Sequence, residues 1–123
     1  MATVELTKDN FEQTVSGNSM VIVDFWAPWC APCRSFAPIF DAASMKHPEI
    51  VFGKINTDVE QELAANFQIR SIPTLMVLRE QVILFSQPGA LHASALDSII
   101  SQALAVDMAE VHEVIKREQP VRL

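Results

Sequence analysis

Apolar patterns typical of strands and of helices alternate along this chain, and the alternation restricts its fold more than any other feature. Short apolar runs predict five strands, at residues 3–6, 21–26, 50–56, 74–78 and 82–85. Apolar residues at helical spacing predict four helices, at residues 9–16, from Cys33 to about His47, at 59–67 and at about 96–104. The order β-α-β-α-β-α-β-β-α predicts a single α/β domain.

Two short links refine this picture. Only residues 79–81 separate the last two strands, too few for a parallel crossover, so these strands are predicted to form an antiparallel hairpin. Within that link, Glu80-Gln81 lacks a residue that readily adopts a positive φ, which predicts a turn without positive φ angles. Gly17 follows the first helix, where a left-handed C-terminal cap is usually glycine.

Composition excludes some classes of function. The chain has 123 residues, half of them apolar, which is enough for a core without disulfide stapling. Its formal net charge of −6, from 15 acidic and 9 basic residues, argues against a nucleic-acid or anionic membrane surface. The first residues do not resemble a signal peptide, and no apolar run approaches the roughly 18 residues of a membrane span. We therefore expect a cytoplasmic protein that binds neither nucleic acid nor membrane.

The chain has two cysteines, and they lie close together. Cys30 and Cys33 are separated by two residues, and at the start of a helix this spacing brings their Cα atoms to about 5–6 Å, within disulfide range. So small a loop removes little entropy from the unfolded chain, which makes the bridge a poor structural staple. In a cytosolic protein such a pair is more often catalytic or metal-binding. The pair therefore predicts a dithiol that opens and closes during function.

A zinc site is the alternative interpretation of the cysteines. It would need two more ligands, and these would have to come from His47, His92 and His112. The histidines are far from the cysteines in sequence and have no ligand-like spacing. We therefore expect no metal.

Asp24 interrupts the otherwise apolar run at residues 21–26. Burial disfavours the charged form of a carboxyl group, so we expect the pKa of Asp24 to be raised. The residues alone leave two interpretations open. The carboxyl group could take part in proton transfer, or it could simply be hydrogen-bonded to backbone.

Three segments resemble the signatures of the thioredoxin family. They are Val-Asp-Phe-Trp-Ala-Pro-Trp-Cys-Ala-Pro-Cys at residues 23–33, Ser-Ile-Pro-Thr-Leu at 71–75 and Pro-Gly-Ala at 88–90. The likeness covers about residues 3–106. It implies a thioredoxin fold, with a central mixed β-sheet flanked by helices on both faces, and a thiol-disulfide oxidoreductase that reduces protein disulfides.

The resemblance also implies roles for the residues around the cysteines. Cys30 would be the nucleophile, because the N–H groups and dipole at the amino end of a helix favour a thiolate. Cys33 would resolve the mixed disulfide, and Asp24 would act through water as the base that deprotonates Cys33. Lys54 would moderate the charge of that carboxylate; the alternative is a lysine that extends to solvent.

A substrate groove is implied beside the cysteines. The family resemblance predicts a cis peptide bond between Ile72 and Pro73 and an Ile72 backbone that pairs with an extended substrate. Trp29 would contribute a flat apolar surface, and Gly89 would allow another backbone to approach. The alternatives for Trp29 and Gly89 are an ordinary surface residue and an ordinary turn.

The two residues between the cysteines have supporting roles. Pro32 pre-sets φ early in the helix and stiffens the loop, and Ala31 stands where the family usually has glycine, which leaves the reduction potential open. No bound cofactor is expected, since the Cys30–Cys33 disulfide is itself the redox group. The resemblance implies that NADPH reduces it through a thioredoxin-reductase-like flavoenzyme and that disulfide-containing proteins are its substrates.

Two other functions remain as alternatives: a disulfide oxidase or isomerase on the same fold, and a non-catalytic partner-binding subunit. We assign residues 1–106 to the thioredoxin domain and 107–123 to a helical extension, because Asp107-x-x-Glu110 resembles a capping box and Val111 and Ile115 continue the apolar spacing. We expect the extension to dock on its own domain in a monomer. A partner-binding or dimer-forming helix is the alternative.

Overall fold

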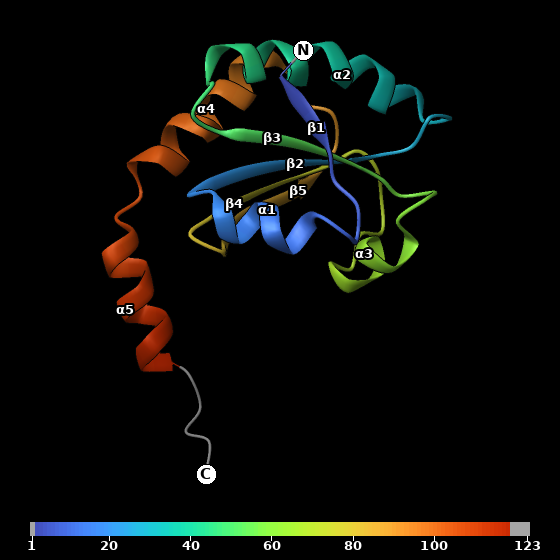
Figure 1. The fold of residues 1–123 in the computed structure, drawn as a ribbon. Coiled ribbons are helices and arrows are strands. Elements are labelled where there is room, and N and C mark those ends of the chain that lie inside the picture. Colours follow the sequence, from blue (N-terminus) through green and yellow to red (C-terminus); the bar gives the residue numbers. More distant parts are fainter. Residues whose placement is uncertain (1, 119–123) are drawn as a thin grey trace.

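A computed structural model describes residues 2–118 of the chain, and it contains one five-stranded sheet with helices on both faces (Figure 1). The strands are β1 (Thr3–Glu5), β2 (Met20–Trp26), β3 (Val51–Asn56), β4 (Thr74–Arg79) and β5 (Val82–Pro88). The helices are α1 (Phe11–Gly17), α2 (Ala31–Lys46), α3 (Gln61–Asn66), α4 (Ala93–Ala105) and α5 (Met108–Glu118). The predicted order of elements and the mixed sheet are confirmed. Between residues 2 and 118 no helix is both long and apolar enough to cross a bilayer.

The sheet is built around β2. The strand order is β1-β3-β2-β4-β5, in which β3 pairs with β1 and β2 in parallel and β4 pairs with β2 and β5 antiparallel. Because β2 is central and covered on both faces, all its residues except Trp26 are buried, as its apolar run predicts. Its register places Asp24 opposite Lys54 of β3.

The alternation of side chains along β2 divides the core into two layers. Ile22 packs with Phe36 and Phe40 of α2, on the face that α2 and α4 cover. Val23 and Phe25 pack on the other face, beside α1 and α3. Since alternate residues of a strand share a face, Asp24 points toward the α2 layer with Ile22.

The prediction of a left-handed C-terminal cap at Gly17 is wrong. Gly17 is the last residue of α1, and the helix ends at Asn18 in an extended conformation, with φ −134° and ψ 140°. The Asn18 side-chain amide donates a hydrogen bond of 2.9 Å to the Thr14 carbonyl. The side chain thus satisfies a carbonyl of the last turn, and no left-handed glycine is needed.

The turn predicted between β4 and β5 is also wrong. Glu80 and Gln81 both have positive φ, 51° and 66°. Arg79 pairs with Val82, so only two residues remain for the turn, and in such a short turn positive φ angles match the twist of the strands. The Glu80 N–H also donates to the Ser19 carbonyl at 2.7 Å. The sheet register therefore imposes the turn on residues that do not favour it.

The helical continuation after α4 is confirmed as far as Glu118, while residues 119–123 of the predicted extension lie outside the part that is described. The Glu110 N–H donates to Asp107 Oδ1 at 3.2 Å, which is the cap expected from the sequence. In Figure 1, α5 lies on the opposite side of the molecule from the start of α2.

The strained turn predicts the effect of a glycine. Gln81→Gly should raise the free energy of unfolding by about 0.5–1 kcal/mol, because glycine adopts positive φ without steric cost. The matched control is Gln13→Gly on the exposed face of α1, which should lower it by about 1 kcal/mol. Urea unfolding of both variants measures these changes, and two changes of the same sign would contradict the account.

Candidate active site

Cys30 and Cys33 form a disulfide at the amino end of α2, with Cα atoms 5.2 Å apart. Cys30 is the N-cap residue of the helix, and Ala31 and Pro32 begin its first turn. Proline is well suited to this place because the first N–H groups of a helix lack intrahelical acceptors. The spacing of the cysteines and their position at a helix start are therefore as the sequence predicts.

The sulfur of Cys30 takes the place of a capping oxygen. The backbone N–H of Cys33 donates to Cys30 Sγ at 3.2 Å. This N–H is one of the first donors of the helix, and the helix dipole adds positive potential at the same point. When the disulfide opens, both effects favour negative charge on Cys30, so the geometry can stabilise a thiolate there.

Apolar groups surround the disulfide. Ala27, Trp26 and Ile72 pack against the two cysteines, which are themselves buried. Both cysteines are therefore shielded from bulk solvent, and Cys33 lies in the first turn of α2, beyond the N-cap.

The segment around Pro73 lies next to the sulfur of Cys30. The Ile72–Pro73 peptide bond is cis, as the resemblance implies. The Ile72 carbonyl oxygen is 3.7 Å from Cys30 Sγ, and the Gly89 N–H donates to the Pro73 carbonyl at 2.8 Å. Gly89 has φ 108°, a conformation that requires glycine. The fold therefore brings Ile72, Pro73 and Gly89 together beside the cysteines.

Trp29 is the exposed aromatic residue at this site, with 68% of its surface accessible. Its indole N–H donates to both carboxylate oxygens of Asp58, at 3.1 and 3.0 Å. This contact fixes the ring at the surface. Sequence reasoning missed Asp58, which lies 29 residues from Trp29 and carries no local signal.

Arg34 is a second residue that sequence reasoning missed. Its guanidinium Nη1 donates to the Pro28 carbonyl at 2.8 Å, across the loop that leads into α2. The bond holds the residues before Cys30 against the first turn of the helix.

Asp24 is completely buried. Among residues 2–118, neither of its carboxylate oxygens has a hydrogen-bond partner, so the backbone-bonded alternative is not what the structure contains. Burial raises the pKa of Asp24 from 3.8 to about 7; the positive charge of Lys54 opposes this rise and the negative charge of Asp41 adds to it. The predicted rise in pKa agrees with this result. Near neutral pH, Asp24 can both accept and release a proton.

Lys54 lies opposite Asp24 on the neighbouring strand β3. It is half-buried on β3, and its Nζ is 4.8 Å from the centre of the Trp26 ring. The contact keeps the ammonium group near the α2 layer instead of fully in solvent. Lys54 is therefore held where it can influence Asp24.

The three histidines do not accompany the cysteines. His47 lies near Glu49, His112 contacts Glu80, and His92 precedes α4. In the described part of the chain, no three His, Cys, Asp or Glu side chains gather so that they could hold a metal ion.

Comparisons with known proteins agree with this geometry. The family model for thioredoxin matches residues 2–102. A candidate thioredoxin 2 from Streptomyces coelicolor is 52% identical over 118 residues, 96% of this chain and 88% of that protein. A thioredoxin from Porphyra purpurea is 39% identical and covers 85% of this chain and 100% of its own. Among solved structures, a thioredoxin from Plasmodium falciparum has a TM-score of 0.75 at 32% identity, with 81% of this chain and 97% of that chain covered.

The raised pKa of Asp24 predicts how stability depends on pH. Because the folded chain holds this proton more tightly than the unfolded chain does, the wild type should lose stability as pH rises from about 4 through about 7. Asp24→Ala removes this loss, so at about pH 8 it should have a free energy of unfolding roughly 1–3 kcal/mol above the wild type.

Urea unfolding at about pH 5 and about pH 8 measures the difference. Asp9→Ala, which removes an exposed carboxyl group, is the matched control and should follow the wild type at both pH values. If the free energies of unfolding of Asp24→Ala and the wild type differed by the same amount at both pH values, this result would contradict the raised pKa of Asp24.

Proposed function

The chain belongs to the thioredoxin family and is a thiol-disulfide oxidoreductase, and we propose that it reduces disulfides of other proteins in the cytoplasm. We propose further that an NADPH-dependent flavoenzyme reduces it in turn. The observation that carries the proposal is the position of Cys30 as the N-cap of α2, with the Cys33 N–H 3.2 Å from its sulfur. A sulfur held there is an effective nucleophile, because the thiolate is the reacting form.

The first chemical step joins the protein to its substrate. The Cys30 thiolate attacks one sulfur of the substrate disulfide, a mixed disulfide forms, and the other substrate sulfur leaves as a thiolate. We assign recognition of the substrate to Trp29, Ile72, Pro73 and Gly89. Trp29 and Gly89 are exposed and Ile72 is half-buried, and the Ile72 carbonyl oxygen beside Pro73 is 3.7 Å from Cys30 Sγ, which supports this assignment.

The second step releases the substrate. Cys33 loses its proton and attacks Cys30 Sγ, so the Cys30–Cys33 disulfide forms and the second substrate sulfur leaves as a thiolate. We propose that Asp24 accepts the proton that Cys33 loses. The Asp24 side chain points into the α2 layer, and its pKa of about 7 suits a base near neutral pH. Lys54 is assigned the moderation of the Asp24 charge.

Each turnover moves two electrons to the substrate and leaves the protein oxidised. A second dithiol must therefore return two electrons, and we propose that a flavoenzyme supplied with NADPH provides it. Reducing compartments keep such a cycle running in the direction of reduction, which supports a cytoplasmic site of action. All residues assigned to the exchange come from one copy of residues 1–106, so we take the monomer as the working unit and residues 107–123 as an extension outside it.

The two steps predict different fates for the two cysteine variants. Cys33→Ser should accumulate a mixed disulfide between Cys30 and a protein substrate, because the resolving thiol is missing. Cys30→Ser, the matched control, should trap none. Intact mass measurement under non-reducing conditions distinguishes them, and equal trapping by both variants would refute the assigned order of attack.

Turnover tests the proposed cycle. With NADPH and a thioredoxin reductase, the wild type should reduce a model protein disulfide catalytically, and Asp24→Ala should do so about tenfold or more slowly. The chain with both Cys30→Ser and Cys33→Ser should be inactive. NADPH consumption measures the rates. Full activity of the double cysteine variant would identify a non-catalytic role, and full activity of Asp24→Ala would remove that residue from the mechanism.

A further inference from the structure

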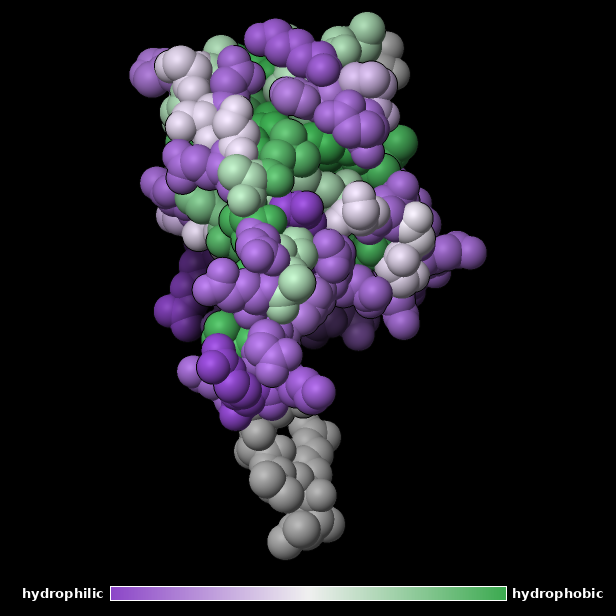
Figure 2. Space-filling model, turned by 90° about the vertical axis from the view of Figure 1, so that its left-hand side faces the viewer, coloured by the Kyte–Doolittle hydropathy of each residue, from purple (hydrophilic) through white to green (hydrophobic). Residues whose placement is uncertain are grey.

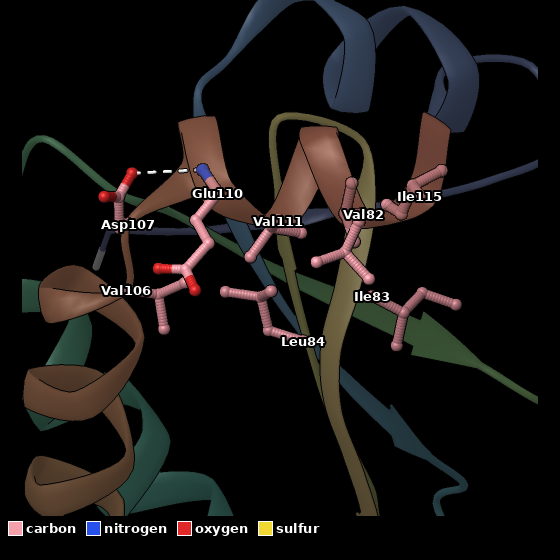
Figure 3. A pocket seen from close by; sticks show the side chains of 9 residues that line it. Val82, Ile83, Leu84, Val106, Asp107, Glu110, Val111 and Ile115 are labelled. Carbon is pink, nitrogen blue, oxygen red and sulfur yellow. Dashed lines mark hydrogen bonds between the residues drawn. The ribbon is translucent and has the colours of Figure 1, made fainter. Parts of the chain in front are cut away.

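The extension helix α5 covers the edge strand β5 only in part. Met108 is buried, and His112 Nε2 lies 2.9 Å from Glu80 Oε1 at the hairpin turn, so the helix is fastened near its start and at its middle. Between α5 and β5 an open groove of about 430 Å³ remains. Figure 3 shows Val111 and Ile115 of α5 on one side of this groove and Val82 and Leu84 of β5 on the other.

Large apolar side chains stay exposed along this groove. The exposed fractions are 47% for Ile83, 39% for Val114 and 38% for Ile115, and all three residues line it. Figure 2, which views the α5 side of the molecule, shows apolar surface next to the polar residues of the helix. A contiguous apolar surface at a sheet edge is typical of an interaction site.

The charges on α5 indicate which molecule fits this surface. Glu110, Val114 and Arg117 follow the i, i+4, i+7 spacing and therefore lie along one stripe of the helix. The acid stands at one end of the stripe, the base at the other and the valine between them. Such a stripe is complementary to itself when two copies meet in opposite directions.

We propose that the α5–β5 groove is the docking surface for a second copy of this chain. A twofold axis near Val114 places Glu110 of each copy against Arg117 of the other, with the two Val114 side chains in contact at the centre. The exposed faces of Ile83 and Ile115 are then covered by the partner helix. Since α5 lies on the opposite side of the molecule from the start of α2, both disulfides remain open to substrate (Figure 1).

The association should be weak. Each copy contributes only one helix and one strand edge to the interface, and the net charge of −6 on each chain makes the two copies repel each other. The dimer is therefore expected at high protein concentration, with the monomer as the active unit at low concentration.

Charge exchange on the full chain tests the pairing. Sedimentation velocity should show the wild type passing from monomer to dimer as concentration rises. Glu110→Arg alone and Arg117→Glu alone should each weaken the dimer about tenfold, because like charges then face each other, and the two changes together should restore it. A mixture of wild type and the doubly exchanged chain should form no mixed dimer, since antiparallel pairing would then oppose like charges.

Matched controls separate the groove from general effects. Glu62→Arg on α3 changes the net charge equally and should leave the dimer intact. Val114→Ser should weaken it about tenfold, whereas Met45→Ser, an exposed apolar residue on α2, should not. Disulfide reduction should be the same in all these variants, which reports that each is folded. A wild type that stays monomeric at all concentrations overturns the proposal, as does a dimer that the single charge changes leave unaffected, which would indicate pairing through the β5 edge alone.

Discussion

The chemistry of the site depends on one contact, the hydrogen bond from the Cys33 N–H to the sulfur of Cys30 at the amino end of α2. The C-x-x-C spacing makes this contact possible, because it places the first sulfur at the N-cap and the second one turn inward. The packing of Phe36 and Phe40 against the sheet fixes the helix in space. The catalytic end of the helix is therefore held by the hydrophobic core, and the sulfur meets a donor that does not need to reorganise.

The central strand β2 places Asp24 at the same site, and the burial of this carboxyl group lowers the stability of the fold. The side-chain alternation that buries Ile22 in the α2 layer also directs Asp24 into it, and the buried carboxyl group has no hydrogen-bond partner within residues 2–118. Burying such a group without a partner destabilises a fold. The raised pKa is the consequence, and it also makes the group useful in proton transfer. Lys54, held over Trp26 on the next strand, limits how far the pKa rises.

Local patterns predicted most of what local physics determines, with the end of α1 at Asn18 as an exception. The apolar runs located the strands and helices, Asp107 capped α5 as expected, and the buried position of Asp24 followed from its apolar neighbours. The cis bond before Pro73 needed the family resemblance, because most X-Pro bonds are trans. Features set by distant parts of the chain were missed: the register of the sheet imposed the Glu80-Gln81 turn, and Trp29 found Asp58 across 29 residues. Neither the turn nor the Trp29–Asp58 hydrogen bond can be recognised from the residues next to it in the sequence.

The central claim is that the end of α2 holds the sulfur of Cys30 ready as an anion, and alkylation measures this directly. In reduced Cys33→Ser, Cys30 is the only thiol, so its rate of reaction with iodoacetamide reports its ionisation as pH changes. If the helix end stabilises the thiolate, this rate rises at distinctly lower pH than that of free cysteine in the same buffer. A rise at the same pH as free cysteine would contradict the claim.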